Sequence, residues 1–217
     1  MKRIQINEPL NQQNNLFMKF KIALLILLGA FLSQSCSTNN NQKKMLQEIK
    51  DNQEITQLLY RNVRSIDRLD LELMKSTYWP DAIQDHQDPI NPIDYSGNAW
   101  EFCEFAVNAL AGVERTHHRL SNILIEINGD KAYAEAYVYA YHYYKTPEGN
   151  KEGTLLGRYQ NRLEKRNGEW KISYRLTIFD ANFTVDATDI WSKDFRNLGQ
   201  RFPNDKSYDI SDLKKSN

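Results

Sequence analysis

Apolar residues change their spacing once along this chain, from a helical period in the first half to alternation in the second. Between Met45 and Asp67 the spacing predicts an amphipathic helix that ends near Asp67, and its apolar stripe is Ile55, Leu58, Leu59, Val63 and Ile66. Residues 69–79 predict a second, short helix that ends before Pro80, followed by a brief extended segment over 82–86.

A loop and a third helix complete the helical half. The segment Asp88–Pro92 contains two prolines and is predicted to be a loop. Ser96 is a suitable N-cap for the third helix, whose apolar face carries Trp100, Cys103, Val107 and Leu110.

After Gly112 the period changes to two, which predicts strands. Residues 117–127 alternate and lead into Asn128-Gly129, a strong signal for a hairpin turn. Residues 132–144 place small residues on one face and a row of tyrosines, from Tyr133 to Tyr143, on the other.

Two further strands follow a predicted loop at 147–153. They cover residues 154–165 and 170–179 and are joined by the tight turn Asn167-Gly168. Helices followed by a meander of long antiparallel strands predict an α+β fold, in which the helices cover one face of the sheet.

Residues 1–35 have the features of an export signal. Met18–Lys21 is basic, and residues 22–31 form a run of ten apolar residues. A spanning helix needs about 20, so the run matches the central region of a signal peptide. We therefore expect translation to start at Met18.

Cys36 follows this run after Leu32-Ser33-Gln34-Ser35, with the small Ser35 directly before it, and the segment resembles the cleavage box of a bacterial lipoprotein. This predicts an acylated Cys36 that anchors an exported protein to a membrane of the cell envelope, on the periplasmic or surface side, with residues 36–45 as a polar tether. The alternative is an ordinary secretory signal in which Cys36 is incidental. If Cys36 is acylated, Cys103 is the thiol that remains in the folded part, and we expect it to be a small buried apolar group.

The charge balance limits the partners. The chain has 28 Lys plus Arg and 28 Asp plus Glu, which argues against a nucleic-acid partner. It contains no CxxC, GxSxG, HExxH or Gly-rich phosphate loop.

His117 and His118 are adjacent in a predicted strand and point to opposite faces, so they cannot share a metal. Asp85, His86 and Asp88 could in principle hold a cation. Three polar residues just before a proline-rich loop are more often exposed to solvent, so we predict no metal site.

The remaining candidates for chemistry are acid–base residues on apolar elements. Tyr60 and Asp67 are two helical turns apart and share one face to within roughly 20°, and that face also carries Val63. A carboxylate beside an apolar stripe is costly unless it is paired. Histidine is the natural partner, because it exchanges a proton near neutral pH and a carboxylate fixes its tautomer. A helix cap plus an ordinary strand histidine is the alternative.

The order of several short motifs resembles the SnoaL-like branch of the nuclear-transport-factor-two-like superfamily, over roughly residues 46–190. The motifs are Tyr60…Asp67, Trp79-Pro80-Asp81-Ala82, Thr116-His117-His118…Asn122, Ile127–Ala132, Glu135-Ala136-Tyr137, Gly157-Arg158-Tyr159…Arg162 and Arg166–Ile172. We expect one domain there and a loosely attached polar tail over 191–217.

The resemblance implies a cone-shaped fold, in which a strongly curved antiparallel sheet wraps around about three helices and encloses a deep apolar pocket. Its enzymes are dehydratases, dehydrohalogenases, ketone isomerases and polyketide cyclases, generally without metal or organic cofactor. In the dehydratases and dehydrohalogenases a histidine removes a proton from carbon and an aspartate orients it. The matching residues are Asp67 and His118. His117 is the rival, because strand alternation puts it with Ile123, Ile125 and Ile127.

Further site residues follow from the same resemblance. Arg175 matches a pocket arginine that helps to stabilise a leaving group. Asn62 stands where the dehydrohalogenase pattern has a lysine, which favours loss of water or double-bond migration over loss of chloride. Tyr60 and His86 would bind substrate. Alternatively, the Tyr60 phenol has a purely structural role and the His86 imidazole lies at the surface. The tyrosine row is equally suited to a subunit interface.

These inferences predict a cofactor-independent lyase or isomerase that acts on a small apolar or polycyclic molecule and forms a homo-oligomer. One alternative is an exported, lipid-anchored module of the same fold that binds a small molecule without catalysis. Another is an assembly subunit with a filled cone.

Overall fold

The computed structural model describes residues 10–86, 94–187 and 198–209. The chain divides into two compact units, residues 1–49 and 50–217, which are described separately. Helix α1 (Leu10–Arg68) provides the described part of the first unit and the first element of the second. Within the described ranges, none of the helices combines the length and the apolar character that a membrane span requires. The export signal and the lipid on Cys36 stay predictions.

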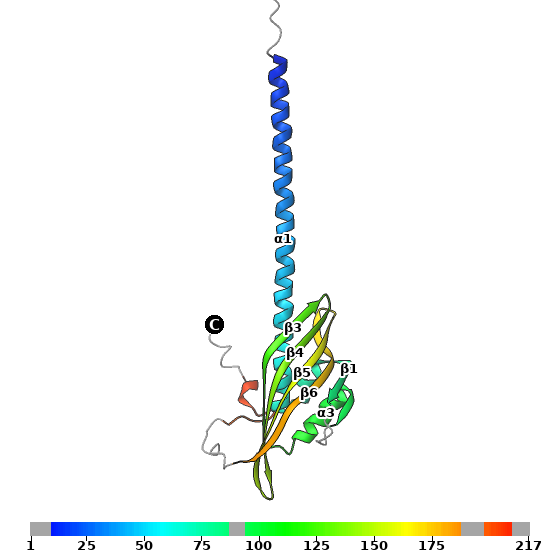
Figure 1. The fold of residues 1–217 in the computed structure, drawn as a ribbon, viewed down its shortest axis with the longest axis vertical. Coiled ribbons are helices and arrows are strands. Elements are labelled where there is room, and N and C mark those ends of the chain that lie inside the picture. Colours follow the sequence, from blue (N-terminus) through cyan, green and yellow to red (C-terminus); the bar gives the residue numbers. More distant parts are fainter. Residues whose placement is uncertain (1–9, 87–93, 188–197, 210–217) are drawn as a thin grey trace, which may run out of the picture. The chain divides into compact units, whose positions relative to one another are not determined.

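The second unit is built on a mixed sheet of six described strands in the order β2-β1-β6-β5-β4-β3 (Figure 1). Their bounds are β1 (Tyr78–His86), β2 (Tyr95–Asn98), β3 (Arg115–Asn128), β4 (Lys131–Thr146), β5 (Gly149–Arg166) and β6 (Glu169–Asp186). The long strands β3 to β6 pair antiparallel, as predicted. The pairing of β1 with β6 is parallel, which the sequence did not predict. The fold is α+β with a curved sheet, and the predicted class is confirmed.

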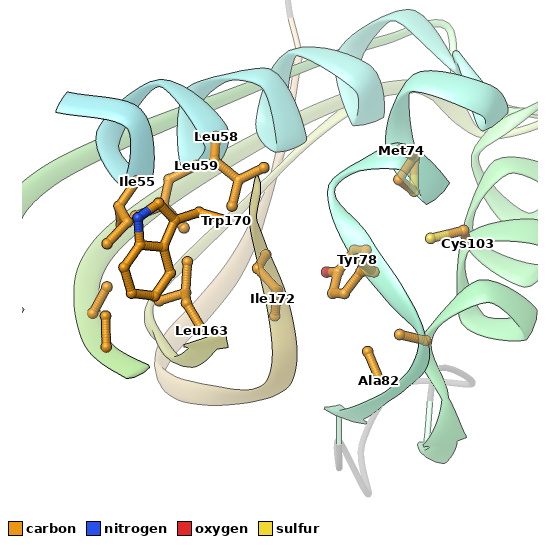
Figure 2. Close-up of a cluster of buried hydrophobic side chains, with 13 residues drawn as sticks. Ile55, Leu58, Leu59, Met74, Tyr78, Ala82, Cys103, Leu163, Trp170 and Ile172 are labelled. Atoms are coloured by element: carbon orange, nitrogen blue, oxygen red, sulfur yellow. The ribbon is translucent and has the colours of Figure 1, made fainter. Parts of the chain in front are cut away.

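The helices bury their apolar faces against the sheet. The stripe predicted for α1 forms the centre of the core: Ile55, Leu58 and Leu59 are at most 2% exposed. They pack with Trp170 and other buried residues of β5 and β6, as Figure 2 shows. Cys103 on α3 (Ala99–Leu110) is 0% exposed, and burial raises the pKa of its thiol to about 12, as expected of a structural cysteine.

The second helix is shorter than predicted. Helix α2 (Leu71–Ser76) ends before the expected boundary, and Pro80 lies inside β1 rather than after a helix over 69–79. Proline lacks the N–H that a strand ladder needs. It is tolerated here because the register between β1 and β6 shifts between Tyr78 and Ile83.

The cap of α3 also differs from the prediction. The Asn98 side chain accepts hydrogen bonds from the main-chain N–H groups of Trp100 and Glu101, whereas Ser96 lies in β2. Both residue types are good N-caps, so the pattern alone could not choose between them. The loop predicted at Asp88–Pro92 lies outside the described residues.

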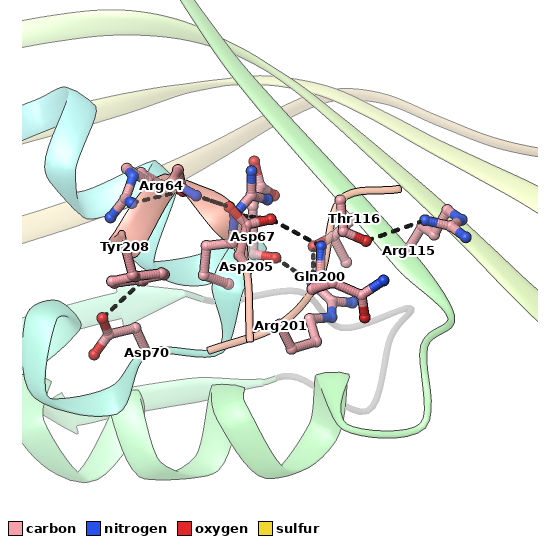
Figure 3. A network of polar contacts seen from close by, with 12 residues as sticks. Arg64, Asp67, Asp70, Arg115, Thr116, Gln200, Arg201, Asp205 and Tyr208 are labelled. Carbon is pink, nitrogen blue, oxygen red and sulfur yellow. Dashed lines mark hydrogen bonds and ion pairs between the residues drawn. The ribbon is translucent and has the colours of Figure 1, made fainter. Parts of the chain in front are cut away.

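The described part of the C-terminal region, residues 198–209, is held to the domain by hydrogen bonds; the rest of the tail predicted over 191–217 lies outside the described residues. Figure 3 shows residues 198–209 beside the end of α1 and the start of β3. The Arg201 guanidinium donates to the main-chain oxygens of Asp67 (2.5 Å) and Val113 (3.0 Å) and to Thr116 Oγ1 (2.8 Å). One side chain thus ties three segments together.

Two acidic groups complete this attachment. The Asp205 carboxylate is 7% exposed, forms an ion pair with Arg68 (3.3 Å) and accepts the N–H of Gln200 (2.8 Å). Hydrogen bonds, chiefly from Ser207, hold the pKa of Asp205 well below its usual range. The Tyr208 hydroxyl donates to the Asp70 carboxylate (2.8 Å). A polar composition therefore did not mean a mobile segment here.

Candidate active site

A cavity of about 670 Å³ lies between the helices and the inner face of the sheet. Its lining is mostly apolar, and a few polar side chains converge on it, as is typical of small-molecule sites. Helix α3 supplies much of the apolar wall, through Phe102, Phe105, Ala106, Ala109 and Leu110. The polar lining residues include Asn62, Tyr78, Gln84, His86, His118, His142, Tyr159, Arg175 and Thr177.

Asp67 and His118 are paired at the wall of this cavity. The His118 Nδ1 is 2.8 Å from Asp67 Oδ1, and the main-chain N–H of His118 donates to both carboxylate oxygens at 3.1 and 3.0 Å. The side chains are 6% exposed for His118 and 11% for Asp67. His118 lines the cavity, whereas Asp67 does not line it and lies behind the His118 ring.

This geometry assigns the tautomer of His118. An ionised carboxylate only accepts hydrogen bonds, so Nδ1 carries the hydrogen and Nε2 keeps its lone pair. Burial raises the pKa of Asp67, but the hydrogen bonds from His118 and the electrostatic interaction with its ring outweigh this effect and leave the pKa below its usual value. Asp67 is therefore ionised at neutral pH, and its carboxylate fixes the orientation and the tautomer of the imidazole.

A β-bulge decides which of the two adjacent histidines faces the cavity. His117 is exposed, and His118 lies on the inner face. The pairing of β3 with β4 shifts register between Ser121 and Leu124, and Asn122 has a φ of 48°. One extra residue reverses the alternation, so His118 shares a face with Ile123. The alternation argument for His117 was therefore wrong.

Arg175 lies in the cavity wall with an unusual set of partners. It is 3% exposed and donates from Nε to Asn161 Oδ1 (2.7 Å) and from Nη1 to Asn62 Oδ1 (2.6 Å). Its guanidinium carbon is 4.6 Å from the ring centre of Tyr159 and 5.4 Å from that of Tyr78. The structure thus places Arg175 at the site, as predicted from the family pattern.

His142 is a second cavity imidazole that the sequence analysis missed. Its ring lies edge-on to His118 with centres 5.5 Å apart. Burial lowers the pKa of His142 to about 4, with a smaller contribution from the nearby His118. It is therefore neutral at pH 7 and both donates and accepts hydrogen bonds. The signal was available, because the alternation that buries Ala140 places residue 142 on the same face.

His86 meets the cavity as predicted, whereas Tyr60 does not. His86 lines the cavity, with Nδ1 3.0 Å from Thr177 Oγ1. Tyr60 is 44% exposed and does not line it, so its predicted position was wrong. The reason is helix geometry: Tyr60 lies about 100° around the helix from the buried Leu59. Tyr78 lines the cavity instead.

The described residues offer no cluster of three or more His, Cys, Asp or Glu side chains suited to a metal ion. Of the acidic pair weighed for a cation, Asp85 accepts a hydrogen bond from the Tyr174 hydroxyl (3.1 Å). Asp88 lies outside the described residues.

Comparison with known protein families shows which family the chain belongs to. The model of the SnoaL-like domain matches residues 47–176. The chain belongs to the SnoaL-like domain family. The cavity therefore lies where the SnoaL-like domain brings its helices against its curved sheet.

Solved structures share the SnoaL-like fold at low identity. The dehydrochlorinase LinA-type3 of Novosphingobium barchaimii, which acts on hexachlorocyclohexane, has a TM-score of 0.58 at 19% identity, covering 67% of this chain and 97% of that one. A type 2 LinA gives 0.57 at 20% identity, covering 67% and 95%. The Kfla4162 protein of Kribbella flavida gives 0.58 at 17% identity, covering 63% and 95%. No curated protein sequence matches the chain.

Proposed function

We propose that this SnoaL-like domain is a cofactor-independent lyase or isomerase of the dehydratase type, in which His118 removes a proton from carbon and Asp67 orients it. The observation that carries the proposal is the 2.8 Å contact of Asp67 with His118 Nδ1 at the wall of a mostly apolar cavity. The likeness to dehydrochlorinases of the same fold is consistent with such chemistry, but at this identity it supports the fold alone.

The first step uses the lone pair of His118 Nε2. It takes a proton from a carbon next to a carbonyl-type group; the electron pair of the C–H bond forms a carbon–carbon double bond, and the π pair of the carbonyl moves onto its oxygen. The imidazolium that forms is stabilised by the ionised Asp67 carboxylate. Arg175 supplies a fixed positive charge to the cavity for an oxygen of the substrate.

The second step returns the proton from Nε2. If it goes to a hydroxyl group on the neighbouring carbon, the carbonyl re-forms, the enolate double-bond pair moves to the neighbouring carbon, and the C–O bond breaks as water leaves, which is a dehydration. If it goes to a different carbon, the double bond migrates, which is an isomerisation. Both outcomes use one imidazole and no external oxidant or reductant.

Asn62 favours these outcomes over loss of chloride. The dehydrohalogenase pattern places a lysine here, whereas the Asn62 amide is 0% exposed and neutral. Its oxygen accepts from Arg175 and its nitrogen donates to Thr77 Oγ1 (2.8 Å). No charge is available at this position to receive a departing halide.

The test uses the two adjacent histidines. Purified protein is incubated in D2O with the small-molecule fraction of a cell extract, and mass spectrometry records compounds that gain deuterium or lose one water. Wild type and His117→Gln should give the same changes, and His118→Gln, shown by circular dichroism to be folded, should lose them. Equal turnover by the two variants would refute the proposal. A compound retained unchanged by wild type would indicate the non-catalytic binding module.

We also propose that the protein is exported and anchored through a lipid on Cys36.

We propose further that the protein forms homo-oligomers through the outer face of β4. Tyr133 and Tyr137 on that face are 38% and 45% exposed. Large exposed aromatics are typical of subunit contacts.

A further inference from the structure

The cavity carries a positive charge that no carboxylate of its lining neutralises. Arg175 is 3% exposed, and none of the described lining residues is Asp or Glu. A buried cation is costly unless an anion or a complete set of hydrogen bonds compensates it. The usual partner of a buried arginine is a carboxylate that binds two of its nitrogens.

The two partners of Arg175 hold its position without cancelling its charge. Asn161 and Asn62 are both neutral amides, and both are themselves fixed, by bonds to the Ala134 carbonyl (3.1 Å) and to Thr77 Oγ1 (2.8 Å). The third nitrogen of the guanidinium, Nη2, is buried and has no hydrogen-bond partner among the described residues. The arrangement therefore lacks one acceptor and one negative charge.

Neighbouring groups do not supply that charge. The Asp67 carboxylate takes its hydrogen bonds from His118, and Arg201 contacts the main chain beside it. The tyrosine rings near Arg175 offer only the partial negative charge of their faces.

We infer that the natural ligand of this cavity is an organic carboxylate with an apolar body, whose negative charge pairs with Arg175. The apolar body matches the wall formed by Phe102, Ala106 and Leu110 of α3. The inference deepens the proposed function by naming its substrate class: the carboxylate is the group by which the substrate is held, and the reacting carbon lies at His118. The carbonyl-type group that activates this carbon is then a second group of the same molecule.

The experiment measures binding of matched probe pairs to the full-length protein. Each pair consists of a carboxylic acid and its primary amide, built on cyclohexane, naphthalene and decane bodies, and Kd is measured by calorimetry at neutral pH. At least one acid should bind about tenfold or more tightly than its amide, as expected for a charge-assisted hydrogen bond. No acid preference in any pair, whether both forms bind or neither does, would overturn the inference.

Variants locate the charge. Arg175→Gln should abolish the acid preference and Arg175→Lys should keep most of it. Arg162→Gln is the matched control, because Arg162 lies on the neighbouring strand over the Tyr174 ring and does not line the cavity. Acid preference that survives Arg175→Gln would also overturn the inference. If Arg175→Gln does not fold, the Kd values of the acid and amide pairs for wild type and Arg175→Lys still test the inference.

The outcome is separable from that of the proposed function. His118→Gln should lose turnover and keep the acid preference. Turnover by wild type without any acid preference would support the acid–base role of His118 and refute only the inference that the ligand is a carboxylate.

Discussion

Asp67 and His118 are 51 residues apart in the sequence, and their side chains meet at 2.8 Å. The carboxylate also accepts the main-chain N–H of His118, so it fixes the strand and the ring together. The last turn of α1 and the start of β3 must therefore keep their relative position for the imidazole to face the cavity.

Arg201 is expected to hold that junction together. Arg201→Ala removes hydrogen bonds to Asp67, Val113 and Thr116, and should lower the free energy of unfolding by about 2–3 kcal/mol, because partly buried acceptors lose a charged donor. Turnover should fall as well, since Asp67 loses its support. Urea denaturation with parallel deuterium-exchange assays measures both.

Arg115 provides the control for this substitution. It lies in the same network (Figure 3) but makes one long contact, 3.5 Å, to the Gly199 carbonyl. Arg115→Ala should change stability by no more than about 0.5 kcal/mol. Equal losses from the two variants would show that the C-terminal segment does not position the site.

The bulge at Asn122 should be sensitive to β-branching. Asn122 has a φ of 48°, which asparagine tolerates and valine does not. Asn122→Val should cost about 1–2 kcal/mol of stability, whereas Ser121→Val, at an exposed strand position next to it, should be nearly neutral. Urea denaturation of both variants checks this, and a well-tolerated Asn122→Val would contradict the left-handed backbone.

This bulge also marks the limit of prediction from the sequence. The helical stripe of α1, the hairpin turns and the α+β class follow from local periodicity, and the family pattern identified Asp67, His118 and Arg175. Alternation alone favoured His117, because a single inserted residue reverses the face of a strand without changing composition. Tyr60 was misplaced for a related reason, since the period of a helix says which residues share a face but not how far the sheet covers it.

His142 was overlooked although the alternation of β4 places it on the same face as the buried Ala140. The C-terminal attachment was missed for a different reason, because it depends on contacts between segments far apart in the sequence, such as Arg201 with Thr116. No local pattern encodes such partners.

Stability should fall as the pH drops from about 6.5 to about 4, and His142 should be the cause. Burial lowers its pKa to about 4, and His118, Asp67 and Arg201 are the ionisable groups that also act on it. Between these values the unfolded state binds the proton and the folded state does not, so stability rises with pH across this window. The loss on acidification is at most about 3 kcal/mol.

His142→Gln should flatten this dependence, measured as the midpoint of urea denaturation at each pH. His117→Gln should leave it unchanged, since His117 is exposed. The contribution of Asp67 lies in a separate window, because its pKa is lowered: it is complete above the usual value of 3.8 and is lost as the pH falls through the lower folded value. A wild-type midpoint that stays constant from pH 6.5 to 4 would contradict the buried, neutral His142.

Cys36 should carry the lipid that the export signal predicts. Protein from the membrane fraction should begin at Cys36 and have a mass raised by acyl chains, and Cys36→Ala should abolish both the added mass and the retention on membranes. Cys103→Ala, at the buried cysteine, is the control and should remain in the membrane fraction. Membrane retention of Cys36→Ala would remove the lipoprotein proposal.

The position of the proton on the His118 ring is the sharpest test of the Asp67–His118 pair. Long-range ¹H–¹⁵N NMR at neutral pH distinguishes protonated from unprotonated ring nitrogens, and the signal lost in His118→Gln identifies the residue. In wild type, Nδ1 should be protonated and Nε2 unprotonated, and Asp67→Asn should lose this single tautomer. A His118 protonated on Nε2, or a tautomer that Asp67→Asn leaves unchanged, would contradict this pairing.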